Sequence, residues 1–162
     1  MRRLLAVLLA AACVIPSASA DSSATPGIEL VAKLYRQFAW EALMNDPGKA
    51  VDFLDQPKAV LESYFEPKLA ALILADRACA AATKEICKLD FAPLWASQDP
   101  SATDLRVVAG SRPESVRVEF RHPGDDQQTV LIFELSPSSA GLRIKDIQYE
   151  EIPSLRGLLE AK

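Results

Sequence analysis

The stretch LDFAPLWASQDP (residues 89–100) decides the fold, because the hydrophobic period of the chain changes across it. Before this stretch, apolar residues recur every three or four positions, which is typical of amphipathic helices. After it, apolar and polar residues alternate, which is typical of strands. We therefore predict that residues 89–100 form the crossover from a helical half to a sheet, anchored in the core by Phe91, Leu94 and Trp95.

The sequence after the crossover predicts about four antiparallel strands. In residues 116–121, apolar side chains alternate with charged ones, as in a strand with one buried face. A turn of Pro, Gly and Asp separates this strand from residues 129–135, so the two segments are predicted to form a β-hairpin. Residues 104–110 and 142–152 complete the sheet. Because the connecting turns are short, neighbouring strands must be antiparallel.

The sequence before the crossover predicts helices. Apolar residues recur at helical spacing in residues 25–45, and the sequence Asn-Asp-Pro-Gly ends the pattern. A second helix is predicted for residues 58–65, and a third begins near Pro67 and ends near Ala80. Helices followed by an antiparallel meander make an α+β domain, with the N-terminal helices packed on the sheet.

The first 20 residues, MRRLLAVLLAAACVIPSASA, have the three parts of a secretory signal peptide: two arginines, an apolar stretch and a small-residue triplet. Cleavage is expected after Ala20, which would place the mature protein in the periplasm or outside the cell. The apolar stretch is shorter than the roughly 20 residues that a membrane-spanning helix needs. The alternative is a lipoprotein anchored at Cys13, although Ala10 replaces the usual Leu three residues before it.

Removal of these 20 residues leaves 142, a length that suits one domain over residues 21–162. It also leaves 16 basic against 22 acidic residues, a net charge of −6. Such a surface disfavours nucleic acids and anionic lipid headgroups, which need clustered Lys and Arg. No later segment could cross a membrane. We expect the partner to be a protein or a small apolar ligand of the cell envelope.

Cysteine usage agrees with export. Without Cys13, the mature chain keeps one pair, Cys79 and Cys87, in the segment CAAATKEIC. In an oxidising compartment such a pair favours a structural disulfide over free thiols or redox chemistry. Zinc is the other alternative, but it would need two further ligands, and the only histidine, His122, is far away in the sequence. We expect a short disulfide loop immediately before the crossover.

The last predicted strand contains a contradiction at Asp146. Strict alternation puts Asp146 on the same face as Leu142 and Ile144. Either its carboxyl group points into the apolar side, or a bulge near Lys145 and Asp146 switches the faces, and the pattern favours the bulge. Because burial would raise the pKa of this carboxyl group and suit it to proton abstraction, Asp146 is a catalytic candidate.

Other signatures of catalysis are sparse. The sequence contains no Gly-x-Ser-x-Gly elbow, no glycine-rich phosphate loop and no metal-binding loop, so we expect neither a metal nor a cofactor. Asp99, in the crossover, is a second candidate acid or base. The candidate ligand-binding residues are Tyr35, Trp40, Tyr64, Trp95 and Asp99. Aromatic residues on amphipathic helices usually belong to the core, which is the alternative for these side chains.

Several motifs resemble an exported bacterial family, the domain-of-unknown-function family numbered 3828. They are LYRQF (34–38), LESYFEPKLAALI (61–73), the cysteine pair, LDFAPLWASQDP (89–100) and LRIKDIQY (142–149). The resemblance covers about residues 28–159. It implies a nuclear transport factor 2-like fold, in which helices pack on a strongly curved antiparallel sheet and enclose a pocket. At residues 89–93 that family often carries Leu-Asp-Phe-Asp-Pro. Here Ala92 replaces the second acid, which argues against a chemistry that uses two paired acids.

Two functions from different classes follow. The first is a secreted or periplasmic, non-enzymatic binding or protein-interaction domain, of cell-envelope, inhibitor or immunity type. The alternative is a small cone-fold enzyme, similar to isomerases or cyclases, that uses Asp146 or Asp99 on an apolar ligand. The enzyme would need an open pocket of several hundred Å³ with one of these carboxylates facing into it. An interior filled by Phe, Trp and Leu side chains would favour the first function.

Overall fold

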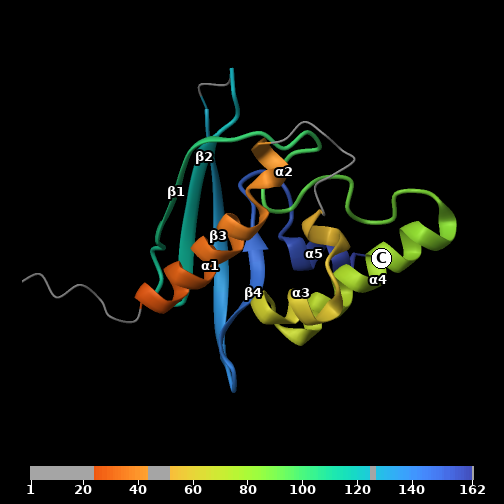
Figure 1. Ribbon diagram of the computed structural model, residues 1–162, viewed down its shortest axis with the longest axis horizontal. Coiled ribbons are helices and arrows are strands. Elements are labelled where there is room, and N and C mark those ends of the chain that lie inside the picture. The colour runs from red at the N-terminus through yellow and green to blue at the C-terminus, as the bar shows by residue number, and fades with distance from the viewer. Residues whose placement is uncertain (1–23, 44–51, 125–126, 162) are drawn as a thin grey trace, which may run out of the picture.

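The computed structural model describes residues 24–43, 52–124 and 127–161, and it confirms the α+β class (Figure 1). The helices are α1 (Ala24–Phe38), α2 (Trp40–Leu43), the 3₁₀ helix η1 (Phe53–Asp55), α3 (Lys58–Tyr64), α4 (Pro67–Thr83) and α5 (Leu155–Glu160). The strands are β1 (Thr103–Ala109), β2 (Ser115–Arg121), β3 (Gln128–Ser138) and β4 (Gly141–Gln148). Five of the six helices precede the strands, as the change of hydrophobic period predicts.

The four strands form one antiparallel sheet in the order β1-β2-β3-β4. Figure 1 shows α1 crossing one face of this sheet, while α3, α4 and α5 gather beside β4. The register pairs Val116 with Phe133 and Val118 with Leu131, and all four side chains are buried. The alternation in residues 116–121 therefore separates a core face from an outer face, as predicted.

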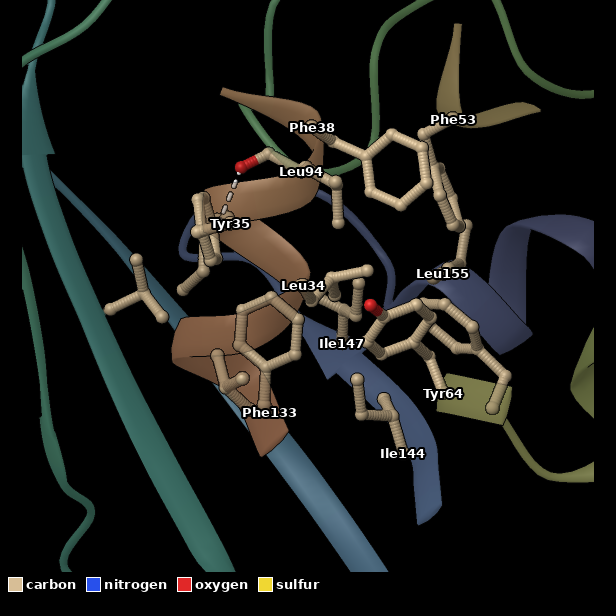
Figure 2. Packing of buried hydrophobic residues seen from close by; sticks show 14 of the residues in the cluster. Leu34, Tyr35, Phe38, Phe53, Tyr64, Leu94, Phe133, Ile144, Ile147 and Leu155 are labelled. Atoms are coloured by element: carbon tan, nitrogen blue, oxygen red, sulfur yellow. Dashed lines mark hydrogen bonds between the residues drawn. The ribbon is translucent and has the colours of Figure 1, made fainter. Parts of the chain in front are cut away.

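The core lies between this face of the sheet and the helices, and it is filled by large side chains (Figure 2). The buried face of α1 consists of Val31, Leu34, Tyr35 and Phe38. These side chains pack with residues of the sheet and of the other helices, among them Phe53, Tyr64, Phe65, Phe133, Ile144, Ile147 and Leu155. Burial of this many large apolar groups is the main favourable contribution to folding.

Gly27 allows α1 to lie close to the sheet. A Cβ atom at this position would come within 2.6 Å of Cδ1 of Leu135 and 3.3 Å of Cγ2 of Val116. A larger residue here would require the Leu135 side chain to move, so glycine gives the room where the first turn of the helix crosses β2 and β3.

One predicted helix is interrupted, and one predicted strand boundary is wrong. The first helix is interrupted, because α1 ends at Phe38 and α2 begins at Trp40; its predicted end near Asn45 lies outside the described residues. The last strand ends at Gln148, before residue 152, and α5 follows it. Ser154 starts α5 by accepting a hydrogen bond from the backbone N–H of Gly157 at 3.1 Å. A serine N-cap ahead of an apolar run is the signal that could have predicted this helix.

The bulge predicted in the last strand is present. Glu134 pairs with Asp146, but the next residue of β3, Leu135, pairs with Ile144, so Lys145 is an extra residue in β4. The extra residue lets Ile144 and Ile147 both face the core, although they are three positions apart. The apparent contradiction in the sequence pattern is therefore explained by the bulge.

The predicted disulfide is also present, between Cys79 in the last turn of α4 and Cys87, with a Cα–Cα distance of 6.2 Å. Lys84 ends the helix in the left-handed conformation, with φ of 63°. The predicted leader, residues 1–20 with Cys13, lies outside the described residues. Within the described ranges, no helix combines the length and the apolar character needed to span a membrane.

Loss of the disulfide should destabilise the protein. Replacing Cys79 and Cys87 together by Ala is expected to lower the free energy of unfolding by about 2 to 3 kcal/mol, because the unfolded chain is no longer closed into a loop. Urea unfolding measures the change, and Ala82→Ser in the same loop is the control that should leave stability unaltered. If the unreduced native protein takes up two alkyl groups by mass spectrometry, the bridge is not formed.

Candidate functional site

The crossover (residues 89–100) folds back on itself. The backbone N–H of Ala92 donates to the carbonyl of Ser97 at 2.8 Å, and the N–H of Trp95 donates to the carbonyl of Ala92 at 3.0 Å. Ala96 adopts a left-handed conformation, with φ of 49°, which turns the chain within this small loop. As a result, Leu94 and Trp95 point inward and are fully buried.

Trp95 and Tyr35, two of the predicted binding residues, lie together in the core. Their rings meet edge to face, with centroids 5.1 Å apart, and Trp95 makes a second edge contact with Phe120 at 5.6 Å. The hydroxyl of Tyr35 donates to the carbonyl of Leu94 at 2.6 Å (Figure 2). Burial raises the pKa of Tyr35 well above its usual value, so this hydroxyl stays a donor. The pair anchors the crossover to α1.

The other aromatic candidates lie apart from this pair. Tyr64 is buried, and its hydroxyl donates to the side-chain carbonyl of Gln37. Trp40, in contrast, is 59 % exposed on α2. Three of the four aromatic side chains thus belong to the core, which is the alternative that the sequence left open.

Glu41 is a partly buried carboxyl group that the sequence did not single out. It lies in α2, where its two oxygens accept hydrogen bonds from the backbone N–H of Phe53 and from the indole N–H of Trp95, the latter at 3.0 Å. Burial raises the pKa of Glu41 to about 7; the Phe53 N–H lowers it, the nearby Asp52 carboxylate raises it, and the Trp95 indole lowers it. The carboxyl group of Glu41, whose pKa is near neutral pH, therefore joins α2 to η1 and to the crossover.

No local signal marks Glu41 in the sequence. Its environment comes from residues 52, 53 and 95, and a single Glu beside an exposed Trp is typical of a solvated helix surface. Only the packing of these separate segments around the carboxyl group makes it unusual.

Asp146, the first catalytic candidate, has its carboxylate occupied by structural hydrogen bonds. The side chain is 9 % exposed and accepts from the backbone N–H groups of Ile147 and Arg156, each at 2.9 Å. The side-chain amide of Gln148 donates a third hydrogen bond, at 3.2 Å. Because Arg156 lies in the first turn of α5, this carboxylate satisfies a free N–H at the helix start and fixes α5 against β4.

Asp99, the second candidate, is exposed at the end of the crossover. Its backbone N–H donates to the hydroxyl of Ser97 at 3.2 Å, and that hydroxyl donates to the Asp99 carbonyl at 3.0 Å. The Ser97 side chain thus stabilises a turn by bonding to the backbone of Asp99. The Asp146 carboxylate is therefore buried and hydrogen-bonded, whereas Asp99 is exposed to solvent.

A surface cavity of about 230 Å³ lies at the end of the sheet where α1 begins. It is lined by Gly27, Pro113, Glu114, Ser115, Val116, Leu135 and Leu142. Neither catalytic candidate and none of the aromatic candidates belongs to this lining. Among the described residues, no three His, Cys, Asp or Glu side chains are grouped so that they could hold a metal ion.

The disulfide loop presents an exposed isoleucine. Ile86 is 70 % exposed, the most of any large apolar side chain in the described ranges. After Ile86, Cys87 is bonded to Cys79, and the Asp76 carboxylate accepts from the backbone N–H of Lys88 at 2.7 Å; before it, the backbone N–H of Glu85 donates to the hydroxyl of Thr83 at 3.2 Å. The sequence predicted the loop but not this residue, although an Ile within a polar turn is a readable signal.

Protonation of Glu41 should make the protein more stable in mild acid. The pKa of Glu41 is raised in the folded state, so its contribution is fully present below about pH 4.5 and is lost as the pH rises through about 7. We expect the wild type to lose about 2 to 3 kcal/mol between pH 5 and pH 8, and Glu41→Gln to lose much less. Urea unfolding at both pH values measures this, and equal losses in the two proteins would contradict it.

Removal of the Asp146 carboxylate should destabilise the fold. Asp146→Ala leaves the buried N–H of Arg156 without its acceptor, which is expected to cost about 1 to 3 kcal/mol. Asp99→Ala, in an exposed turn, should change stability by less than about 0.5 kcal/mol. Thermal and urea unfolding compare the two variants, and an unaffected Asp146→Ala protein would refute the structural role.

Comparison with known proteins adds no relative from which a role could be transferred. No protein-family model, no curated protein and no solved structure matches this chain.

Proposed function

We propose that this chain is an exported, non-enzymatic protein-interaction domain of the cell envelope, and that the disulfide loop is its contact element. The observation that carries this proposal is the exposed Ile86, held in a loop that is closed by the Cys79–Cys87 bond. A contact residue whose backbone is already held loses less conformational entropy when a partner covers it than one in a flexible loop. A few well-packed side chains usually carry most of the energy of a protein interface.

The filled interior supports the same assignment. The space between helices and sheet, where a cone-fold enzyme would hold its substrate, is occupied by aromatic and aliphatic side chains such as Tyr35, Trp95, Phe120 and Phe133. The Asp146 carboxylate is bonded to backbone N–H groups, and Asp99 is in solvent. These settings favour structural roles for both acids, so the enzyme alternative is not adopted.

Export and family membership are parts of the same proposal. The leader-like sequence of residues 1–20 supports secretion, and the disulfide is of the kind that persists in oxidising compartments. The motifs quoted above support kinship with the domain-of-unknown-function family numbered 3828 and a nuclear transport factor 2-like arrangement. An antiparallel sheet with helices on one face is compatible with that arrangement.

Site-specific photo-cross-linking tests the contact element. A benzoylphenylalanine placed at Ile86 should give a discrete adduct with one protein in an envelope extract of the source organism. The matched control is the same probe at Ser139, which is exposed in the turn between β3 and β4. Equal labelling from both positions, or no adduct from position 86, would reject the proposal.

Binding to the partner identified in this way should depend on the apolar side chain. Ile86→Asp is expected to weaken the affinity at least about tenfold, because a charge would be placed in an apolar contact. Ile86→Val keeps the chemistry and should retain most of the affinity. Titration calorimetry with the purified partner distinguishes these outcomes, and an unchanged affinity for Ile86→Asp would show that the loop is not the contact element.

A further inference from the structure

The two edge strands of the sheet, β4 and β1, differ in whether another segment pairs with their outer side. The edge of β4 is closed, because Phe65 forms a parallel bridge with Ile144 and the backbone N–H of Glu66 donates to the Ile144 carbonyl at 2.9 Å. β1 is the strand at the other edge, as Figure 1 shows; α1 packs against it, but no described strand pairs along its outer edge. An open edge carries backbone groups that can pair with another strand.

The pattern of β1–β2 hydrogen bonds identifies which backbone groups face the open edge. Gly110 donates to the carbonyl of Ser115 at 2.9 Å, so these two residues form a hydrogen-bonded pair. Such pairs alternate along an antiparallel ladder, and the register then makes Val108 the next residue bonded to β2. The N–H and C=O groups of Val107 and Ala109 must point the other way, toward the open edge.

The side chains of β1 are unusually apolar and exposed for an edge strand. Leu105 is 39 % exposed and Val108 is 40 % exposed, and Arg106 is the only charged residue from position 105 to 109. The bulge that commonly protects an edge lies between Thr103 and Arg106. The residues after it pair regularly with β2, so a stretch with free backbone groups remains available.

We propose that β1 pairs in antiparallel fashion with β1 of a second copy of this chain, around a two-fold axis at Val108, and so joins two sheets into one of eight strands. In this register Val107 of each copy lies opposite Ala109 of the other. Their outward N–H and C=O groups then form four hydrogen bonds with one another. A register centred on Val107 would instead extend into the bulged residues and lose this regular pairing.

The side chains are compatible with this symmetric register. The two Val108 side chains meet at the axis on the outer face, which covers an exposed apolar group in each copy. Arg106 lies opposite Gly110 of the second copy, so no like charge and no side chain opposes the guanidinium group. An isologous contact of this kind needs only one self-complementary surface. Because one strand pair is a small interface, we expect a dissociation constant on the order of 10 to 100 μM.

Disulfide trapping tests the register directly. In a Cys13→Ser background of the full chain, Val108→Cys should form a cross-linked dimer under mild oxidation, because directly opposed residues of a non-hydrogen-bonded pair lie at disulfide distance. Ser139→Cys is the control at an exposed position far along the sequence, and it should cross-link at least about tenfold more slowly. Equal rates for the two variants would overturn the proposal.

Sedimentation velocity over a concentration series tests the pairing without cross-links. Ala109→Pro removes an outward N–H while leaving the β1–β2 bonds intact, so it should shift the protein to monomer; Ala109→Ser keeps the N–H and should not. If Ala109→Pro fails to fold, Val108→Lys gives the same answer by placing two ammonium groups at the axis. A wild type that stays monomeric up to about 1 mM, or a dimer that survives both substitutions, would refute β1 pairing.

Two further outcomes separate this inference from the function proposed above. If Val108→Cys becomes linked only to other proteins of an envelope extract, the open edge takes a foreign strand and the second-copy proposal fails. Ile86→Asp should leave the monomer–dimer equilibrium unchanged, since Ile86 is not part of β1. Loss of partner binding and loss of dimerisation are therefore measured by independent variants.

Discussion

The indole ring of Trp95 contacts the two N-terminal helices and the sheet, both far from it in the sequence. Its edges pack against Tyr35 of α1 and Phe120 of β2, and its N–H donates to Glu41 of α2. The crossover loop can place this ring in the core because its own backbone is satisfied by internal hydrogen bonds. Trp95 thus ties the crossover to both the helical half and the sheet, which also pack on each other directly through the core.

Three carboxyl groups show how position decides the role of one chemical group. Burial, and to a smaller extent the Asp52 carboxylate, raise the pKa of Glu41 to about 7. Asp146 is more deeply buried, and the N–H groups of Ile147 and Arg156 that donate to it hold α5 in place. Asp99 lies in solvent. A sequence supplies the same carboxyl group in each case, and the donors and charges around it determine what it does.

The elements that were predicted well are those with a long, regular hydrophobic period. The alternation in β2 and the helical spacing in α1 extend over several residue pairs or turns, so local pattern and tertiary burial agree. Helix α5 was missed because its six residues carry too short a pattern. Trp40 and Tyr64 could not be told apart, since an aromatic residue on a helix looks the same whether another element covers it or not.

The sequence by itself determined the α+β class, the place of the crossover, the disulfide pair and the bulge near Asp146, because each depends on residue types within a few positions of one another. Only the tertiary structure decided that Glu41 is hydrogen-bonded by Trp95, that Ile86 stays exposed and that β1 keeps an open edge. Those features arise from segments brought together from distant parts of the chain, and from segments that no other part covers, which local patterns do not encode.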